Sequence, residues 1–101
     1  MRLRQIAHAR AGDKGHLLNI AVIAFEAADY ARLVRVLTAD RVAAHFAGIA
    51  RGEVVRYELP RIGALNFVLS RGTRESVTRT LALDAHGKSL SSVLLDMEIP
   101  D

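Results

Sequence analysis

The sequence predicts an α+β fold in which an antiparallel or mixed sheet of four to five strands carries helices on one face. Three observations support this class. Several short segments alternate apolar and polar residues with the period of a strand, residues 27–37 show helical spacing, and helical segments are inserted between the strands. Because 101 residues leave room for one core and one sheet, residues 1–101 are expected to form a single domain.

The composition is that of a globular protein. Half of the residues are hydrophobic and a quarter are charged, which argues against disorder. Fourteen basic against eleven acidic side chains give a net charge of +3, a weak preference for anions. Aromatic residues make up 5% of the chain and the basic residues are scattered, so no nucleic-acid partner is expected.

The sequence also indicates where the protein acts. Cysteine is absent, which excludes thiolate chemistry and is compatible with a reducing compartment, so a cytoplasmic location is expected. Residues 1–8 alternate arginine with apolar residues and do not resemble a signal peptide. The apolar run at residues 17–25 is far shorter than the roughly 20 residues that span a bilayer, so no membrane partner is expected.

The first quarter of the chain predicts a strand, a polar loop and a second strand. Residues 2–9 alternate imperfectly, which indicates a strand with a bulge. Residues 10–16 read as a polar loop, in which Gly12 and Gly15 could adopt a positive φ. Residues 17–25 are almost wholly apolar and rich in β-branched side chains, which is typical of a central strand buried on both faces.

Two helices are predicted next. Residues 27–37 place their large apolar side chains on one helical stripe. Thr38 fits the N-cap of a second, short helix with Asp40 in its first turn. This helix has an apolar face that extends to Phe46, and Gly48 is a plausible stop.

The remaining segments predict mainly strands. Residues 53–59 alternate with period two, whereas residues 62–69 are ambiguous and fit a short helix or turn better than a strand. Residues 77–83 predict a strand, and residues 84–87 supply the turn residues of a hairpin. Residues 90–99 are interpreted as a last strand, although their apolar spacing would equally serve a helix. This order of elements suits the ferredoxin-like two-layer sandwich.

The polar loop is the candidate site. Arg10, Gly12, Asp13, Lys14 and Gly15 combine two cations, a carboxylate and two glycines between two strands. Glycines let successive backbone N–H groups turn toward one point, and such a concavity binds anions, to which the cations would add charge. The alternative is an ordinary hairpin turn with solvated polar residues. The spacing is not that of a P-loop.

Two asparagines interrupt apolar segments. Asn19 lies in the predicted central strand, where a buried amide would need hydrogen-bond partners. Asn19 and Asn66 are therefore interpreted first as braces for the backbone of the loop.

Metal binding and self-sufficient catalysis have little support. His8 and His16 flank the loop and, with Asp13, could form an N,N,O set of zinc ligands, but this spacing is common by chance. No metal and no cofactor are expected. The serines lack the context of a nucleophile, and Asp13 or His16 could act as a general base only in a site completed by another group.

Several segments together resemble a known family, the AtuA-like ferredoxin-fold domain, which is the small domain of the acyclic terpene utilisation protein AtuA. The segments that carry the resemblance are Ala9–Gly15, Leu18–Ile20, Leu37–Thr38, Val42–Phe46, Arg56–Pro60, Ala64–Leu69, Asp84–Lys88 and Leu94–Ile99. The resemblance implies a ferredoxin-like fold and a larger AtuA-type partner, and no settled reaction. It supports as candidate site residues Arg10, Gly12, Asp13, Lys14, Gly15, Asn19 and Asn66.

Two positions depart from the pattern expected of that family. Ala11 stands where a serine is expected, and His16 stands where an acidic residue is expected. These departures weaken any role that needs a hydroxyl or a carboxylate there, including a site for a hard cation.

Two hypotheses about function follow. The first is a small accessory or ligand-binding subunit that assembles with itself and with an AtuA-type partner in acyl-CoA or terpenoid breakdown. It would present the Arg10–Gly15 segment to a small anionic ligand, to acyl-CoA or to an interface. The second is an independent enzyme that acts on a small anionic substrate, with Asp13 or His16 as the acid or base and Arg10 or Lys14 as the anion clamp.

Overall fold

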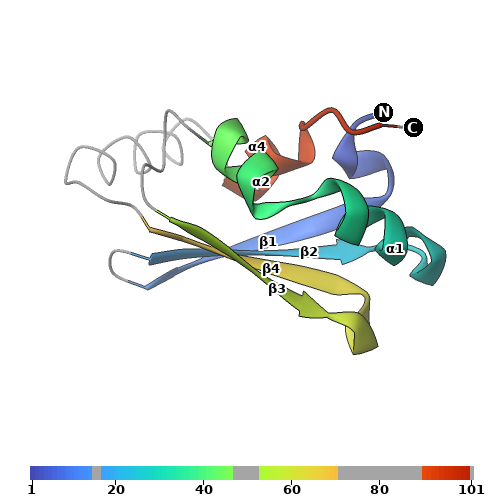
Figure 1. The fold of residues 1–101 in the computed structure, drawn as a ribbon, viewed down its shortest axis with the longest axis horizontal. Coiled ribbons are helices and arrows are strands. Elements are labelled where there is room, and N and C mark those ends of the chain that lie inside the picture. Colours follow the sequence, from blue (N-terminus) through green and yellow to red (C-terminus); the bar gives the residue numbers. More distant parts are fainter. Residues whose placement is uncertain (15–16, 47–52, 71–89, 101) are drawn as a thin grey trace.

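The protein is a two-layer α+β sandwich, with a twisted sheet below and helices above it (Figure 1). The structure is a computed structural model, and it describes residues 1–14, 17–46, 53–70 and 90–100. The elements in chain order are a 3₁₀ helix η1 (Leu3–Gln5), β1 (Ala7–Lys14), β2 (Leu17–Ala24), α1 (Ala27–Val36), α2 (Ala39–His45), β3 (Val54–Leu59), a second 3₁₀ helix η2 (Pro60–Ile62), β4 (Ala64–Ser70) and α4 (Leu90–Leu95).

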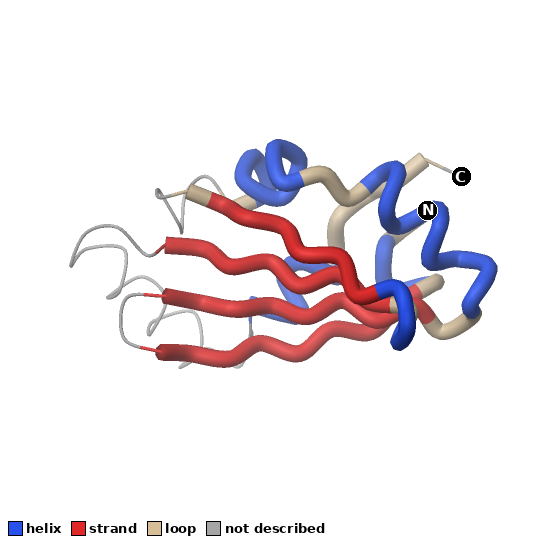
Figure 2. Tube along the Cα trace, turned by 60° about the horizontal axis from the view of Figure 1, so that its bottom comes forward, coloured by secondary structure: helices blue, strands red, loops and turns tan. Residues whose placement is uncertain are grey.

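The four described strands form one antiparallel sheet in the order β1-β2-β4-β3. Strands β1 and β2 form a hairpin, and β4 inserts between β2 and β3. Figure 2 shows the strands side by side, with the helices on the far side of the sheet. The predicted fold class is confirmed, and so are the strands at residues 17–25 and 53–59. The prediction that the first of these is buried on both faces is wrong, because alternate residues of β2 are buried on one face only.

The core lies between the sheet and the helices. Alternate residues of the two central strands are buried on this side, and these are Leu18, Ile20, Val22, Leu65, Phe67 and Leu69. They pack against buried helix residues such as Leu33 and Val42. Because successive side chains of a strand point to opposite faces, this burial leaves the other residues of β2 and β4 on the uncovered side of the sheet.

The two helices after β2 form where the sequence predicts them. Helix α1 turns Leu33 and Val36 into the core. The Thr38 hydroxyl accepts a hydrogen bond from the backbone N–H of Arg41 at 3.1 Å, which confirms Thr38 as the N-cap of α2. At the other end of α2, Nε2 of His45 lies 2.7 Å from the carbonyl oxygen of Val93 in α4 and donates to it.

Arg56 of β3 joins the sheet to the C-terminal end of α1. Its guanidinium donates to the carbonyl oxygens of Val34 at 2.7 Å and Leu37 at 2.9 Å, and it forms an ion pair with Glu58 at 3.2 Å. The last carbonyls of a helix have no partner within the helix and carry a partial negative charge. A half-buried cation therefore both caps α1 and fixes it over β3.

The strand predicted at residues 2–9 and the polar loop predicted at residues 10–16 are wrong in their boundaries. Residues 3–5 form η1, and β1 continues to Lys14, so Arg10, Gly12, Asp13 and Lys14 belong to a strand. Alanine and glycine give little contrast between the two faces of a strand, so the alternation in β1 is weak in the sequence. Pairing with β2 along the whole of β1 decides the structure.

The prediction for residues 62–69 is also wrong. Only η2 is a turn, and Ala64–Ser70 is a central strand. Gly63 separates the two with φ 63°, a left-handed conformation that ends the 3₁₀ turn. An apolar run of this length has no decisive period of its own, and its neighbours on both sides, β2 and β3, determine its conformation.

The last segment is a helix rather than the preferred strand. Helix α4 buries Leu90 and Leu94 over β1, which is the helical spacing that the sequence offered as an alternative. After α4 the chain runs antiparallel to its beginning, where the N–H of Leu3 donates to the carbonyl oxygen of Met97 at 2.9 Å.

Three further predictions lie outside the described residues. These are the strand at residues 77–83, the hairpin turn at residues 84–87 and the helix stop at Gly48. Within the described ranges, none of the helices has the length and apolar character needed to cross a membrane.

Replacing Arg56 tests its role as a cap. Arg56→Met keeps much of the side chain's length and apolar stem but removes three hydrogen bonds, so we expect the free energy of unfolding to fall by about 1–3 kcal/mol. Urea denaturation followed by circular dichroism measures this change. Arg41→Met is the matched control, because Arg41 is exposed on α2. Equal stability of the two variants would contradict the assignment.

Candidate functional site

The candidate site is the side of the sheet that the described helices leave uncovered, which we call the open face (Figure 2). The strand register places its side chains in rows that cross all four strands. The three complete rows are His8, Ile23, Ala64 and Leu59; Arg10, Ala21, Asn66 and Tyr57; and Gly12, Asn19, Val68 and Val55. Ala64 is the exception among them, because it is fully buried.

The open face brings together four of the residues singled out in the sequence. Arg10 and Asn66 share the central row, and Gly12 and Asn19 are direct partners in the next row. A Cβ added at Gly12 would lie 3.7 Å from Oδ1 of Asn19, so the asparagine side chain lies beside the glycine. The four positions converge because they alternate along adjacent strands, and not because a loop gathers them.

Of the other three candidate residues, the structure describes the backbones of Asp13 and Lys14 and does not describe Gly15. The backbones of Asp13 and Lys14 continue β1 and pair with Leu18 and Leu17. Gly15 lies outside the described residues. The predicted concavity of backbone amides is therefore replaced, as far as Lys14, by an extended strand.

Asn19 is exposed, which corrects the prediction of a buried amide that braces the loop. The odd-numbered residues of β2 face away from the core, and Asn19 is one of them. Asn66 is half-buried on the same face. In the part of the chain that the structure describes, neither amide makes a hydrogen bond within the chain, so both can serve a partner from outside.

Large apolar side chains are exposed from the centre of the open face to its end beside η2, and the sequence analysis did not identify them as part of the site. Phe25 is 57% exposed, Tyr57 54%, Leu59 41% and Ile62 64%. The N–H of Ala24 donates to the carbonyl oxygen of Gly63 at 3.0 Å, which brings the end of β2 beside η2. Apolar residues that are exposed together, rather than singly, mark interaction surfaces. The alternation of residues 53–59 had placed Tyr57 and Leu59 on one side, and this was the signal available in the sequence.

His8 belongs to this apolar end. Its ring stacks on that of Phe25, with centroids 5.7 Å apart and planes inclined by 18°. The proposed zinc partner His16 lies outside the described residues, and no group of three metal-binding side chains occurs within them.

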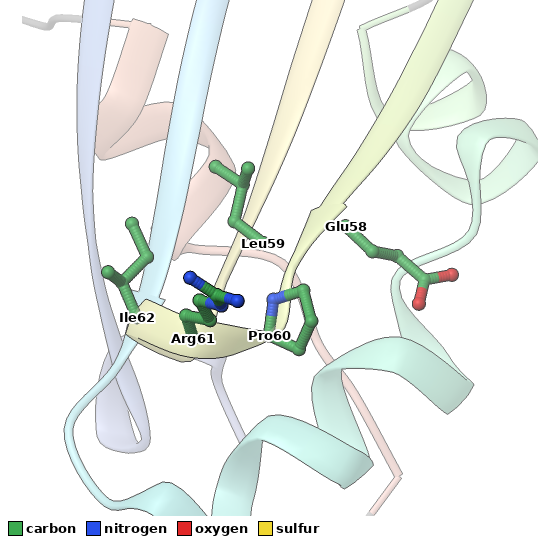
Figure 3. A pocket seen from close by; sticks show the side chains of 5 residues that line it. All are labelled: Glu58, Leu59, Pro60, Arg61 and Ile62. Carbon is green, nitrogen blue, oxygen red and sulfur yellow. The ribbon is translucent and has the colours of Figure 1, made fainter.

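A shallow depression of about 310 Å³ adjoins the open face at η2 (Figure 3). It is lined by Glu58, Leu59, Pro60, Arg61 and Ile62. The guanidinium of Arg61 lies between the side chains of Leu59 and Ile62, whereas Glu58 points away from them. The depression therefore adds apolar surface and one exposed cation to the end of the open face.

The chemistry of the open face is that of a docking surface. It offers a guanidinium, two amides, aromatic rings and aliphatic side chains on the surface of a sheet. Arginine, tyrosine and phenylalanine are enriched in the cores of protein interfaces, where most charged side chains are depleted. A set of this kind binds a complementary surface more readily than it encloses a small reacting molecule.

Replacing Gly12 and Gly63 by alanine is expected to change the stability of the protein in opposite directions. Gly12 lies in an extended strand, where a Cβ would make only ordinary van der Waals contact with Asn19, so Gly12→Ala is expected to stabilise the protein by about 0.5–1 kcal/mol through lost freedom of the unfolded chain. Gly63→Ala is expected to destabilise it by about 1 kcal/mol, because φ is 63° there. Thermal unfolding of both variants measures these signs. Destabilisation by Gly12→Ala would show that position 12 needs a conformation that alanine cannot adopt.

Comparison with known proteins gives one match. Residues 1–100 match the model of the AtuA ferredoxin-like domain. No curated protein and no solved structure matches the chain.

Proposed function

Since the chain belongs to the AtuA ferredoxin-like domain family, we propose that it is a small accessory subunit that assembles with other proteins through its open face. The family resemblance suggests a larger AtuA-type protein as one partner and acyl-CoA or terpenoid breakdown as the setting. The proposal keeps the cytoplasmic location expected from the sequence.

The observation that carries this proposal is that one face of the sheet, which the described helices leave uncovered, exposes polar and apolar side chains of an interface-like composition. Tyr57 and Leu59 expose large apolar surfaces there, and burying apolar surface contributes about 25 cal/mol per Å². Arg10, Asn19 and Asn66 lie on the same face with polar groups that a partner could satisfy. Four strands in fixed register hold these groups in place before a partner binds, which lowers the entropy cost of binding.

A protein surface fits the open face better than a small anion does. Sites for small molecules are concave and bury most of the ligand. The open face is a sheet surface, and the depression beside it at Arg61 is shallow and lined mainly by apolar groups. Within the described residues, the open face therefore supports a protein partner more than a small anionic ligand, acyl-CoA or an independent enzyme that would use one.

A substitution in the centre of the open face tests the proposal. Asn66→Arg introduces a long charged side chain at a half-buried position of the central row, and we expect it to abolish assembly while circular dichroism remains that of the folded protein. Association is measured by size-exclusion chromatography with light scattering, for the protein alone and after mixing with an AtuA-type large protein. Arg41→Glu on the helix layer is the control, and it should assemble as the wild type does.

Two outcomes would contradict the proposal. The first is a wild-type protein that remains monomeric and does not bind the AtuA-type protein at tens of micromolar. The second is an Asn66→Arg variant that assembles as tightly as the wild type, which would place the interface elsewhere.

A further inference from the structure

Resting on the proposed function, we infer that the partner of the open face is an acidic protein surface, with carboxylates that pair with Arg10 and Arg61 on either side of an apolar centre. Charges that face each other across an interface are complementary, because like charges repel where water is excluded. The charges that the open face presents, and those that it lacks, therefore indicate the chemistry of its partner.

Arg10 and Arg61 are exposed cations at opposite margins of the open face. Within the described residues, neither guanidinium forms a hydrogen bond or an ion pair. Three other arginines pair with carboxylates at the chain ends or on the helix side of the sheet, and these are Arg2, Arg4 and Arg56. The two cations of the open face are thus available to a carboxylate from outside the chain.

The open face offers these cations no carboxylate. The three complete rows contain none. Glu58 lines the depression beside Arg61, but it points away and pairs with Arg56 on the helix side. Glu53 precedes β3, at the opposite edge of the sheet from Arg10, so the strands alone separate the two by roughly 14 Å. This exceeds the distance of about 8 Å over which exposed charges interact at physiological salt.

Apolar side chains lie between the two cations. Tyr57 shares the central row with Arg10, at the other edge of the sheet, and Leu59 follows along β3 toward η2. Figure 3 shows the Arg61 side chain between Leu59 and Ile62. An apolar centre with polar groups at its margins is the usual composition of a protein interface. The complementary surface has apolar side chains in the middle and carboxylates at two margins.

Other occupants satisfy only part of the open face. A second copy of this chain would bring the same cations and no carboxylate in the three complete rows, so it does not supply the missing charge. A nucleic acid would supply phosphates, but its binding depends on many cations along the backbone, and it would leave Leu59 and Ile62 without apolar contacts. An acidic protein surface satisfies the cations and the apolar side chains together.

Charge reversal tests the inference. Arg10→Glu replaces an attraction with a repulsion, and we expect the dissociation constant for the AtuA-type protein to rise about tenfold or more. Arg61→Glu should act in the same direction. Arg41→Glu, on the helix layer, changes the net charge of the chain by the same amount and should bind as the wild type does. Biolayer interferometry with the folded variants measures these constants. Equal weakening by Arg10→Glu and Arg41→Glu would overturn the inference, because net charge alone would then explain the effect.

Salt dependence provides a second test. The wild-type association rate with the AtuA-type protein should fall when the ionic strength rises from about 0.01 M to about 0.15 M, because the screening length shortens from about 30 Å to about 8 Å. Arg10→Met keeps much of the apolar stem and removes the charge, so it should lose part of this dependence, whereas Arg41→Met should keep it. A wild-type rate that stays constant or rises with salt would contradict an acidic partner.

The outcomes separate this inference from the proposed function. If Asn66→Arg abolishes binding to the AtuA-type protein while Arg10→Glu and Arg61→Glu leave it unchanged, the docking role stands and the acidic partner is refuted. Self-association that Asn66→Arg abolishes, without binding of the AtuA-type protein, would place a second copy on the face and refute the acidic partner. Binding only to an oligonucleotide, or only to vesicles that contain phosphatidylserine, would refute both proposals, as would a wild type that binds nothing.

Discussion

The antiparallel pairing of β2 with β4 determines which side chains this protein buries and which it presents. The pairing sets Ile20 opposite Phe67 on the helix side and Ala21 opposite Asn66 on the other side. A slip of one residue in either strand would exchange the two sets. The apolar side chains on the helix side fix the register, because they can be buried only in this alignment. Packing of the core therefore determines which side chains lie on the open face.

The parts of the fold that the sequence predicts well are those with a strong period and a matching end signal. Helix α1 has an uninterrupted apolar stripe, and Thr38 supplies a local hydrogen bond that begins α2. Prediction from the sequence fails where the apolar spacing is faint or fits both a helix and a strand. Half of strand β1 is alanine and glycine, so its two faces differ little in the sequence. The spacing of Leu90 and Leu94 fits both a helix and a strand, and packing over β1 favours the helix.

The candidate site was likewise predictable only in part. Arg10, Gly12, Asn19 and Asn66 were identified by type and by family resemblance, and they do lie together. The reason for their proximity could not be seen, because it depends on a register between strands that are up to about fifty residues apart in sequence. Asn19 was expected to be buried, since an apolar run does not reveal which of its faces is covered. Only the placement of the helices decides that, and they cover a single side of β2.

Arg56 connects the two layers, so a contact on the open face can affect the helix layer. Its side chain holds the carbonyl oxygens at the end of α1, while its neighbour in β3, Tyr57, points out on the opposite side of the sheet. Whatever restrains Tyr57 also restrains the strand that anchors the helix. Occupation of the sheet surface would then slow amide hydrogen exchange in the last turn of α1, although no residue of that turn lies on the occupied side.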